Sequence, residues 1–211
     1  MLSSIFLSLL SLTFTTALPT DSHLDKRQST GSGPFTLIAA HSGSPIHLQA
    51  INANGGSFWI GKPPLTYCPV PPVPPGDCPP GTETALNVES GNCGLATEVP
   101  GGQDVYVAYS GALSFTEPHE EGGEVGAITG FAYQNNTNTT GGLGVFSFTG
   151  LGSLGGFVAC PTVNGTGPYQ IFADLPYLCD KAVPGGNVSA CIGFDALGDS
   201  FANETAAFEY E

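Results

Sequence analysis

Basic residues are scarce in this chain, which has four Lys and Arg against 18 Asp and Glu among 211 residues. Two of the four, Lys26 and Arg27, lie in an N-terminal leader, so only Lys62 and Lys181 remain once it is removed. Two lysines cannot neutralise a run of phosphates, which excludes nucleic-acid binding. Electrostatic binding to an anionic membrane surface is excluded for the same reason. We therefore expect neither a nucleic acid nor a membrane as partner.

Uninterrupted segments suited to helices are also missing, because 30 Gly and 18 Pro break every stretch long enough for three turns. Short apolar segments separated by Gly, Pro and Asn turns recur instead, and these are typical of strands. They predict an all-β fold, either an antiparallel sandwich or a closed barrel of short strands, stabilised by disulfides. The expected strands are residues 34–40, 45–51, 57–60, 84–88, 105–109, 112–116, 128–133, 145–149, 156–160, 169–174, 191–197 and 207–210.

Recognisable catalytic motifs are also absent from the sequence. No serine has glycines at the spacing of a nucleophile elbow, and the glycine-rich segment at 150–156 does not precede a helix that could bind phosphate. No Cys-x-x-Cys pair occurs, and the histidines are scattered, so a zinc site is not indicated. We expect no cofactor, no metal and no enzymatic activity.

The N-terminus has the pattern of a secretory leader. Residues 2–17 form a short apolar run that ends in Thr15-Thr16-Ala17, which suits signal peptidase cleavage after Ala17. Residues 18–27 then form a short propeptide ending in the dibasic pair Lys26-Arg27, ahead of a Ser/Gly linker. This predicts a signal peptide at 1–17, a propeptide at 18–27 and a single β domain at 28–211. The mature protein is expected to be secreted, extracellular and monomeric.

Five Asn-x-Ser/Thr sequons support secretion, and all lie in gaps between the expected strands or just ahead of the last one. Their asparagines are Asn135, Asn138, Asn164, Asn187 and Asn203. We therefore predict a glycoprotein.

The six cysteines all lie in the mature part, an even number in an oxidising compartment, so disulfides are expected. They are Cys68, Cys78, Cys93, Cys160, Cys179 and Cys191. Sequence does not choose among the connectivities. Nearest-neighbour pairing would join Cys68 to Cys78 and Cys179 to Cys191.

Two segments are expected to be loops. Residues 63–81 contain nine prolines in nineteen residues, which indicates an extended, disulfide-tied excursion from the body rather than a domain boundary. Residues 117–126 carry Glu117, Glu120, Glu121 and Glu124, and we interpret them as a solvated acidic loop rather than a calcium site.

Four polar residues and one tryptophan are candidate site residues. His41 and His47 flank a turn and are interpreted as polar turn residues rather than metal ligands. Asp174 and Asp195 lie in strand-like segments, where paired carboxylates could serve a glycosidase, although a strand acid facing solvent is favoured for Asp195. Core packing accounts for Trp59, the single Trp, so a sugar-stacking role is the weaker interpretation.

Several segments resemble a known family. Residues 44–53 (SPIHLQAINA) with 58–61 (FWIG) are similar to the opening of fungal secreted proteins described as IgE-binding, which are related to the PhiA-type cell wall proteins. Residues 99–108 and 111–116 resemble the middle of that family, and 156–161, 169–173 and 191–195 resemble its end. The resemblance implies a fungal surface or secreted glycoprotein, allergen-like, with no established enzymatic activity and no catalytic residues to transfer.

The leading hypothesis is thus a secreted, glycosylated, non-catalytic fungal protein of the cell surface or cell wall, with cell-wall polysaccharide as the candidate partner. One alternative is an acid-active hydrolase with paired carboxylates in a β cleft. The other is a carbohydrate-binding or effector module.

Overall fold

A computed structural model describes residues 33–211 except 75, 121, 136–141, 164 and 202–205. Within these residues, 13 strands join one sheet and two more form a separate ribbon, with every strand-to-strand pairing antiparallel. Hydrogen-bonded neighbours run in the order β1-β5-β6-β7-β8-β3-β13-β12-β14, and β14 pairs again with β1, so the path closes on itself. The predicted all-β, antiparallel, disulfide-bonded fold class is confirmed.

The strands are short, as the spacing of turns predicted. Their bounds are β1 Phe35–Ala40, β2 Ile51–Asn54, β3 Ser57–Ile60, β4 Thr66–Tyr67, β5 Leu86–Glu89, β6 Asn92–Leu95, β7 Asp104–Ala108, β8 Leu113–Phe115, β9 Gly126–Ala127, β10 Phe131–Gln134, β11 Gly144–Phe148, β12 Phe157–Val163, β13 Thr166–Ala173, β14 Ile192–Ser200 and β15 Glu209–Tyr210. Three single-turn 3₁₀ helices, η1 Gly122–Glu124, η2 Gly150–Gly152 and η3 Val188–Ala190, are the helical segments in the described part of the chain. No helix of these residues has the length and hydropathy needed to cross a bilayer.

The strand expected at 45–51 is wrong, because residues 42–48 form turns and the strand β2 begins at Ile51. The alternation there is misleading, since Ile46 is fully buried while Leu48 is 60% exposed and has φ of +60°. A leucine in the left-handed region cannot continue a strand. The turn is fastened to β1 instead, because Leu48 N donates to Ala39 O at 2.7 Å and Ala39 N donates to Gln49 O at 2.9 Å.

Phenylalanine rings form the centre of the core. Phe146 stacks between Phe131 at 5.7 Å and Phe157 at 5.4 Å between ring centroids, and Phe157 in turn stacks on Phe194 at 6.2 Å. All four are at least 94% buried. These four rings form a row, the phenylalanine row, because they face inward from the neighbouring strands β10, β11, β14 and β12. Phe157 and Phe194 are direct partners in the β12–β14 register.

Two disulfides form, Cys68–Cys78 and Cys160–Cys191, while Cys93 and Cys179 are free thiols. The predicted Cys68–Cys78 bond is confirmed, but the Cys179–Cys191 bond and the participation of all six cysteines are wrong. The reason is strand register, because β12 pairs Ala159 with Ile192 and so sets the neighbouring residues Cys160 and Cys191 opposite each other, with a Cα–Cα distance of 4.2 Å.

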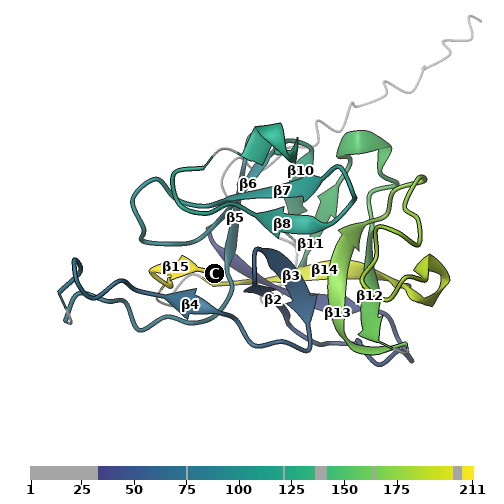
Figure 1. Cartoon of the computed structure of the whole chain (residues 1–211), viewed down its shortest axis with the longest axis horizontal. Helices are drawn as coiled ribbons and strands as arrows, with labels where there is room; N and C mark the ends of the chain where they lie inside the picture. Colours follow the sequence, from purple (N-terminus) through teal and green to yellow (C-terminus); the bar gives the residue numbers. More distant parts are fainter. Residues whose placement is uncertain (1–32, 75, 121, 136–141, 164, 202–205) are drawn as a thin grey trace, which may run out of the picture.

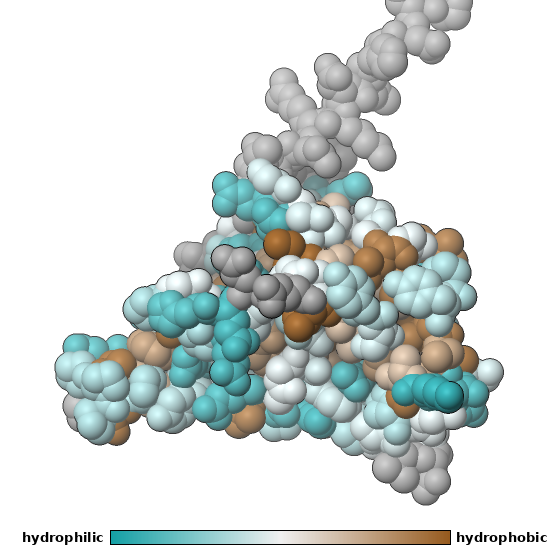
Figure 2. Space-filling view, turned by 45° about the horizontal axis from the view of Figure 1, so that its top comes forward, coloured by the Kyte–Doolittle hydropathy of each residue, from teal (hydrophilic) through white to brown (hydrophobic). Residues whose placement is uncertain are grey.

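The proline-rich segment forms an arm that projects from the body at the left of Figure 1. The Cys68–Cys78 bond closes the arm, and at its base β4 pairs with β15. Figure 2 shows its surface as mostly hydrophilic, with a few brown apolar residues among them. The predicted disulfide-tied excursion is confirmed.

The two free thiols should differ sharply in reactivity. Burial, and the nearby charge of Asp104, raise the pKa of the Cys93 thiol well above its usual value, while Cys179 is exposed. We expect a thiol reagent to label one cysteine in the native protein and a second only after denaturation without reductant. Peptide mapping should assign the first to Cys179. Two native-state labels, or none after denaturation, would contradict the disulfide pattern.

Candidate functional site

A cleft of about 540 Å³ opens where four strands of the sheet end. It lies at the last residue of β1, at the first residues of β12 and β14, and at Asp174 directly after β13. The buried rings of Phe157 and Phe194 line its apolar side. The polar residues that line it are Ser42, His41, His47, Asp174 and Asp195. The structure thus brings together both histidines and both aspartates that the sequence had singled out separately.

The turn at 42–48 positions the two histidines. His41 N donates to His47 Nδ1 at 3.2 Å, and His41 Nδ1 forms a hydrogen bond with the Gly193 carbonyl oxygen on β14. Because a carbonyl oxygen only accepts, His41 carries its proton on Nδ1; because His47 Nδ1 accepts, neutral His47 carries its proton on Nε2. In the neutral state the Nε2 atom of His41 can accept a hydrogen bond, and that of His47 can donate one.

The two carboxylates of the cleft differ in exposure. Asp195 is exposed on β14, as the sequence predicted for a strand acid facing solvent, and Asp174 is half-buried. Asp174 is held at its backbone, since its N–H donates to Gly156 O at 3.0 Å and its carbonyl accepts from Leu154 N at 3.1 Å. These bonds fix the position of the residue and leave both carboxylate oxygens for a ligand.

The arrangement of side chains does not indicate a metal site. Among the described residues there is no group of three or more His, Cys, Asp or Glu side chains that could hold a metal ion. The cleft therefore offers hydrogen-bonding groups rather than a coordination sphere.

Trp59 lies on the sheet surface and not in the core, which corrects the packing interpretation. The ring is half-buried, Lys62 Nζ lies 3.2 Å from its centroid, and its Nε1 donates to Asn54 O at 2.8 Å. Asn52 Nδ2 donates to Lys62 O at 2.8 Å and holds this lysine segment in place. The ammonium covers one face of the indole through a cation–π contact, so that face is not free to stack on a sugar.

A second pocket, also of about 540 Å³, was not anticipated. It lies beside β15 and is lined by Tyr67, Glu117, Glu209 and Glu211 among others. Glu209 and Glu211 lie at the C-terminal strand, whereas Glu117 follows β8 and is distant from them in sequence, so only the tertiary fold brings Glu117 to this pocket. Burial, and then repulsion from Glu211 and Glu117, raise the pKa of the Glu209 carboxyl.

Glu209→Gln should stabilise the protein slightly at neutral pH. The raised pKa means that the folded state favours the protonated acid, so stability is lost as pH rises from the carboxyl's unfolded pKa toward its higher folded value. We expect a gain in melting temperature of about 2 °C or less at pH 7, and no gain well below the unfolded pKa. Glu89→Gln, at an exposed carboxylate on β5, is the control. A gain that persists at low pH would contradict the explanation.

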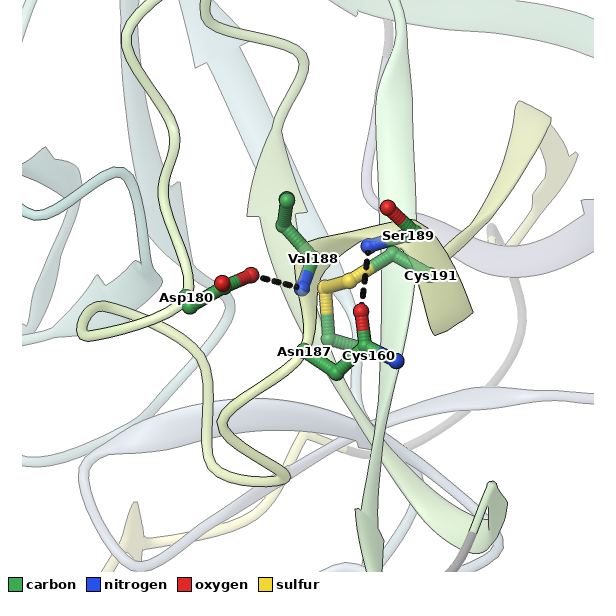
Figure 3. The surroundings of a disulfide bond; sticks show 6 residues. All are labelled: Cys160, Asp180, Asn187, Val188, Ser189 and Cys191. Atoms are coloured by element: carbon green, nitrogen blue, oxygen red, sulfur yellow. Dashed lines mark hydrogen bonds between the residues drawn. A yellow bond between two sulfur atoms is a disulfide. The ribbon is translucent and has the colours of Figure 1, made fainter.

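Two of the five sequon asparagines can be placed. Asn135 is exposed directly after β10, and Asn187 is exposed directly before η3. Asn187 Oδ1 accepts from Ser189 N at 3.1 Å, next to the Cys160–Cys191 bond (Figure 3). Asn138, Asn164 and Asn203 lie outside the described residues, as do the processing sites Ala17, Lys26 and Arg27.

The described features together define an all-β, disulfide-bonded domain of the kind found in secreted proteins, with a small polar cleft. Comparison with known proteins identifies the family within this class. The family model for PhiA-like secreted proteins matches residues 35–211. The chain therefore belongs to the PhiA-like secreted protein family. It is 34% identical over 177 residues to an uncharacterized secreted protein of Arthroderma benhamiae, covering 82% of this chain and 84% of that relative. No solved structure matches it.

The family resemblance and the secreted location expected from the sequence are confirmed, and the chain is a secreted fungal protein. The family description carries no enzymatic name. The IgE-binding and glycoprotein descriptions stay predictions.

Proposed function

We propose that this secreted fungal protein is a glycosylated, non-catalytic component of the cell surface, retained by non-covalent binding to cell-wall polysaccharide. The observation that carries the proposal is the cleft at the ends of β1, β12, β13 and β14, whose polar side chains present hydrogen-bonding atoms to solvent. Secreted binding sites for carbohydrate use such groups to replace the water around sugar hydroxyls.

Exposure of the carboxylates argues against the hydrolase alternative. A glycosidase needs one carboxylic acid whose pKa is raised by burial in an apolar environment. Asp195 is exposed and Asp174 is only half-buried, so the cleft lacks a deeply desolvated acid among its described residues.

The histidines do not complete a hydrolytic triad either. A triad imidazole is oriented by a carboxylate at one nitrogen and activates a hydroxyl with the other. His41 Nδ1 is bonded to a backbone carbonyl and His47 Nδ1 to a backbone N–H, so neither is oriented by an acid in the described structure. These contacts support binding rather than acyl transfer.

Glycosylation is proposed from the sequons, supported by the exposure of Asn135 and Asn187. Both lie in loops, where a glycan would meet solvent and leave the core undisturbed. Carbohydrate and the excess of acids would together keep the protein soluble at the wall.

Sedimentation with purified insoluble wall glucan, chitin and mannan tests the proposal. We expect saturable retention on at least one polymer by protein isolated from culture medium, and a mass decrease on enzymatic removal of N-glycans. The same preparation should release no sugar or peptide from a substrate panel at acidic pH. Turnover that Asp195→Asn abolishes would establish the hydrolase instead.

A further inference from the structure

The geometry points to the cleft as a binding site for a neutral sugar residue that carries two adjacent free hydroxyl groups. This inference rests on the proposed function and names the ligand of that same cleft. The volume of about 540 Å³ lies in the range of about 300–1,000 Å³ typical of small-molecule sites.

The balance of donors and acceptors sets the ligand's chemistry. The carboxylates of Asp174 and Asp195 supply four acceptor oxygens, and neutral His41 adds an acceptor at Nε2. Side-chain donors among the described lining residues are fewer, namely the Nε2–H of neutral His47 and the hydroxyl of Ser42. An acceptor-rich cleft favours a ligand that donates hydrogen bonds, and each free sugar hydroxyl can donate one.

A carboxylate can accept from two hydroxyls at once, because its two oxygens lie side by side. Hydrogen bonds to an ionised acceptor are short and about twice as strong as those between neutral groups. Adjacent hydroxyls on one ring match the two oxygens, as the two N–H groups of an arginine do. Asp195 and Asp174 are therefore the residues that we expect to select a vicinal pair.

The charge of the cleft excludes acidic sugars. Among the described residues no Lys or Arg lines the cleft, and the whole chain has a formal net charge of −14, so a uronic acid or phosphorylated sugar would be repelled. The buried rings of Phe157 and Phe194 form a fixed floor, which positions the polar groups before the ligand arrives.

The turn at 42–48 places the two histidines at the cleft. Leu48 is 60% exposed in a left-handed backbone conformation, and its N–H donates to Ala39 O, which holds the turn against β1. The same turn sets the His41–His47 hydrogen bond and presents both imidazoles to the cleft.

Binding to soluble mannan, whose residues carry adjacent free hydroxyls, tests the inference. We expect the wild-type protein to bind mannan and to lose binding when the polymer has been oxidised with periodate and reduced, because periodate cleaves the carbon–carbon bond between adjacent hydroxyls. A glucan linked through its 3-hydroxyl groups, whose internal residues lack such a pair, should bind at least about tenfold more weakly.

Two cleft variants test whether mannan binds in the cleft. Asp195→Asn and Asp174→Asn should each weaken mannan binding about tenfold or more. Asp199→Asn removes the same charge from an exposed position on β14 outside the cleft lining, and Trp59→Ala removes the sheet-face aromatic. Both should bind as the wild type does, and melting curves confirm that each variant is folded.

The outcomes separate this inference from the proposed function. Wall binding that survives in both cleft variants, or tighter binding to an amino-sugar polymer than to mannan, overturns the sugar site and leaves wall attachment standing. If the wild type binds no wall polymer, the proposed function fails. NMR titration with methyl mannoside then tests whether the cleft itself binds a sugar. Shifts of the His41 and His47 ring resonances, with His119 unchanged, support the site; no shift overturns it.

Discussion

Phe146→Ala is expected to lower the free energy of unfolding by about 4 kcal/mol, the cost of removing a large aromatic side chain from a close-packed core. Phe146 is 1% exposed and stacks with Phe131 and Phe157 while also contacting Phe35 at 5.9 Å between ring centroids. The loss should appear as a fall in melting temperature of about 10 °C for a domain of this size.

Tyr109→Ala is the control for Phe146→Ala, because it truncates an aromatic ring that is 62% exposed. Surface truncations of this kind change stability by about 0.5 kcal/mol or less. Equal melting temperatures for Phe146→Ala and the wild type would mean that the phenylalanine row is not the centre of the core. Because Phe157 belongs both to that row and to the cleft, we also expect Phe146→Ala to weaken binding indirectly by loosening the floor.

Removing the Cys160–Cys191 bond should have the second largest effect. The bond closes a loop with a sequence separation of 31, and in the chain-entropy account its loss costs about 3.5 kcal/mol. The double variant Cys160→Ala, Cys191→Ala should therefore melt about 10 °C lower than the wild type under non-reducing conditions.

Cys179→Ala distinguishes the observed pairing from the one that chain proximity suggests. Cys179 is an exposed free thiol, so its replacement should leave the melting temperature unchanged. A fall equal to that of the double variant would show that Cys179 is paired. Reductant should destabilise the wild type and have less effect on the double variant.

The strands and their class follow from local pattern, because alternating burial along a short segment is a property of that segment alone. Residues 34–40 and 145–149 were expected as strands and form β1 and β11 within one residue at each end. The segment 45–51 shows the limit, since its alternation is real but one residue, Leu48, adopts a backbone conformation incompatible with a strand. Turn signals at Ser42-Gly43 and Pro45 were the local indication of that outcome.

The candidate site depended on contacts that no local pattern contains. His41 and His47 come from a turn after β1, Asp174 from the end of β13 and Asp195 from β14, and their meeting requires β14 to pair with both β1 and β12. The sequence indicated the histidines as turn residues and the aspartates as strand acids but did not join the two pairs, because residue types alone do not say which strand ends share an edge.

Sequence alone determined where this protein resides and what class of fold it has. An apolar N-terminal segment, an excess of acids and turn-separated short strands are local or compositional properties, and each constrains the chain without reference to distant contacts. Tertiary structure alone decided which cysteines bond and which side chains share the cleft. Both outcomes are set by the register of β12, β13, β14 and β1, and register depends on the free energy of the packed core rather than on any one segment.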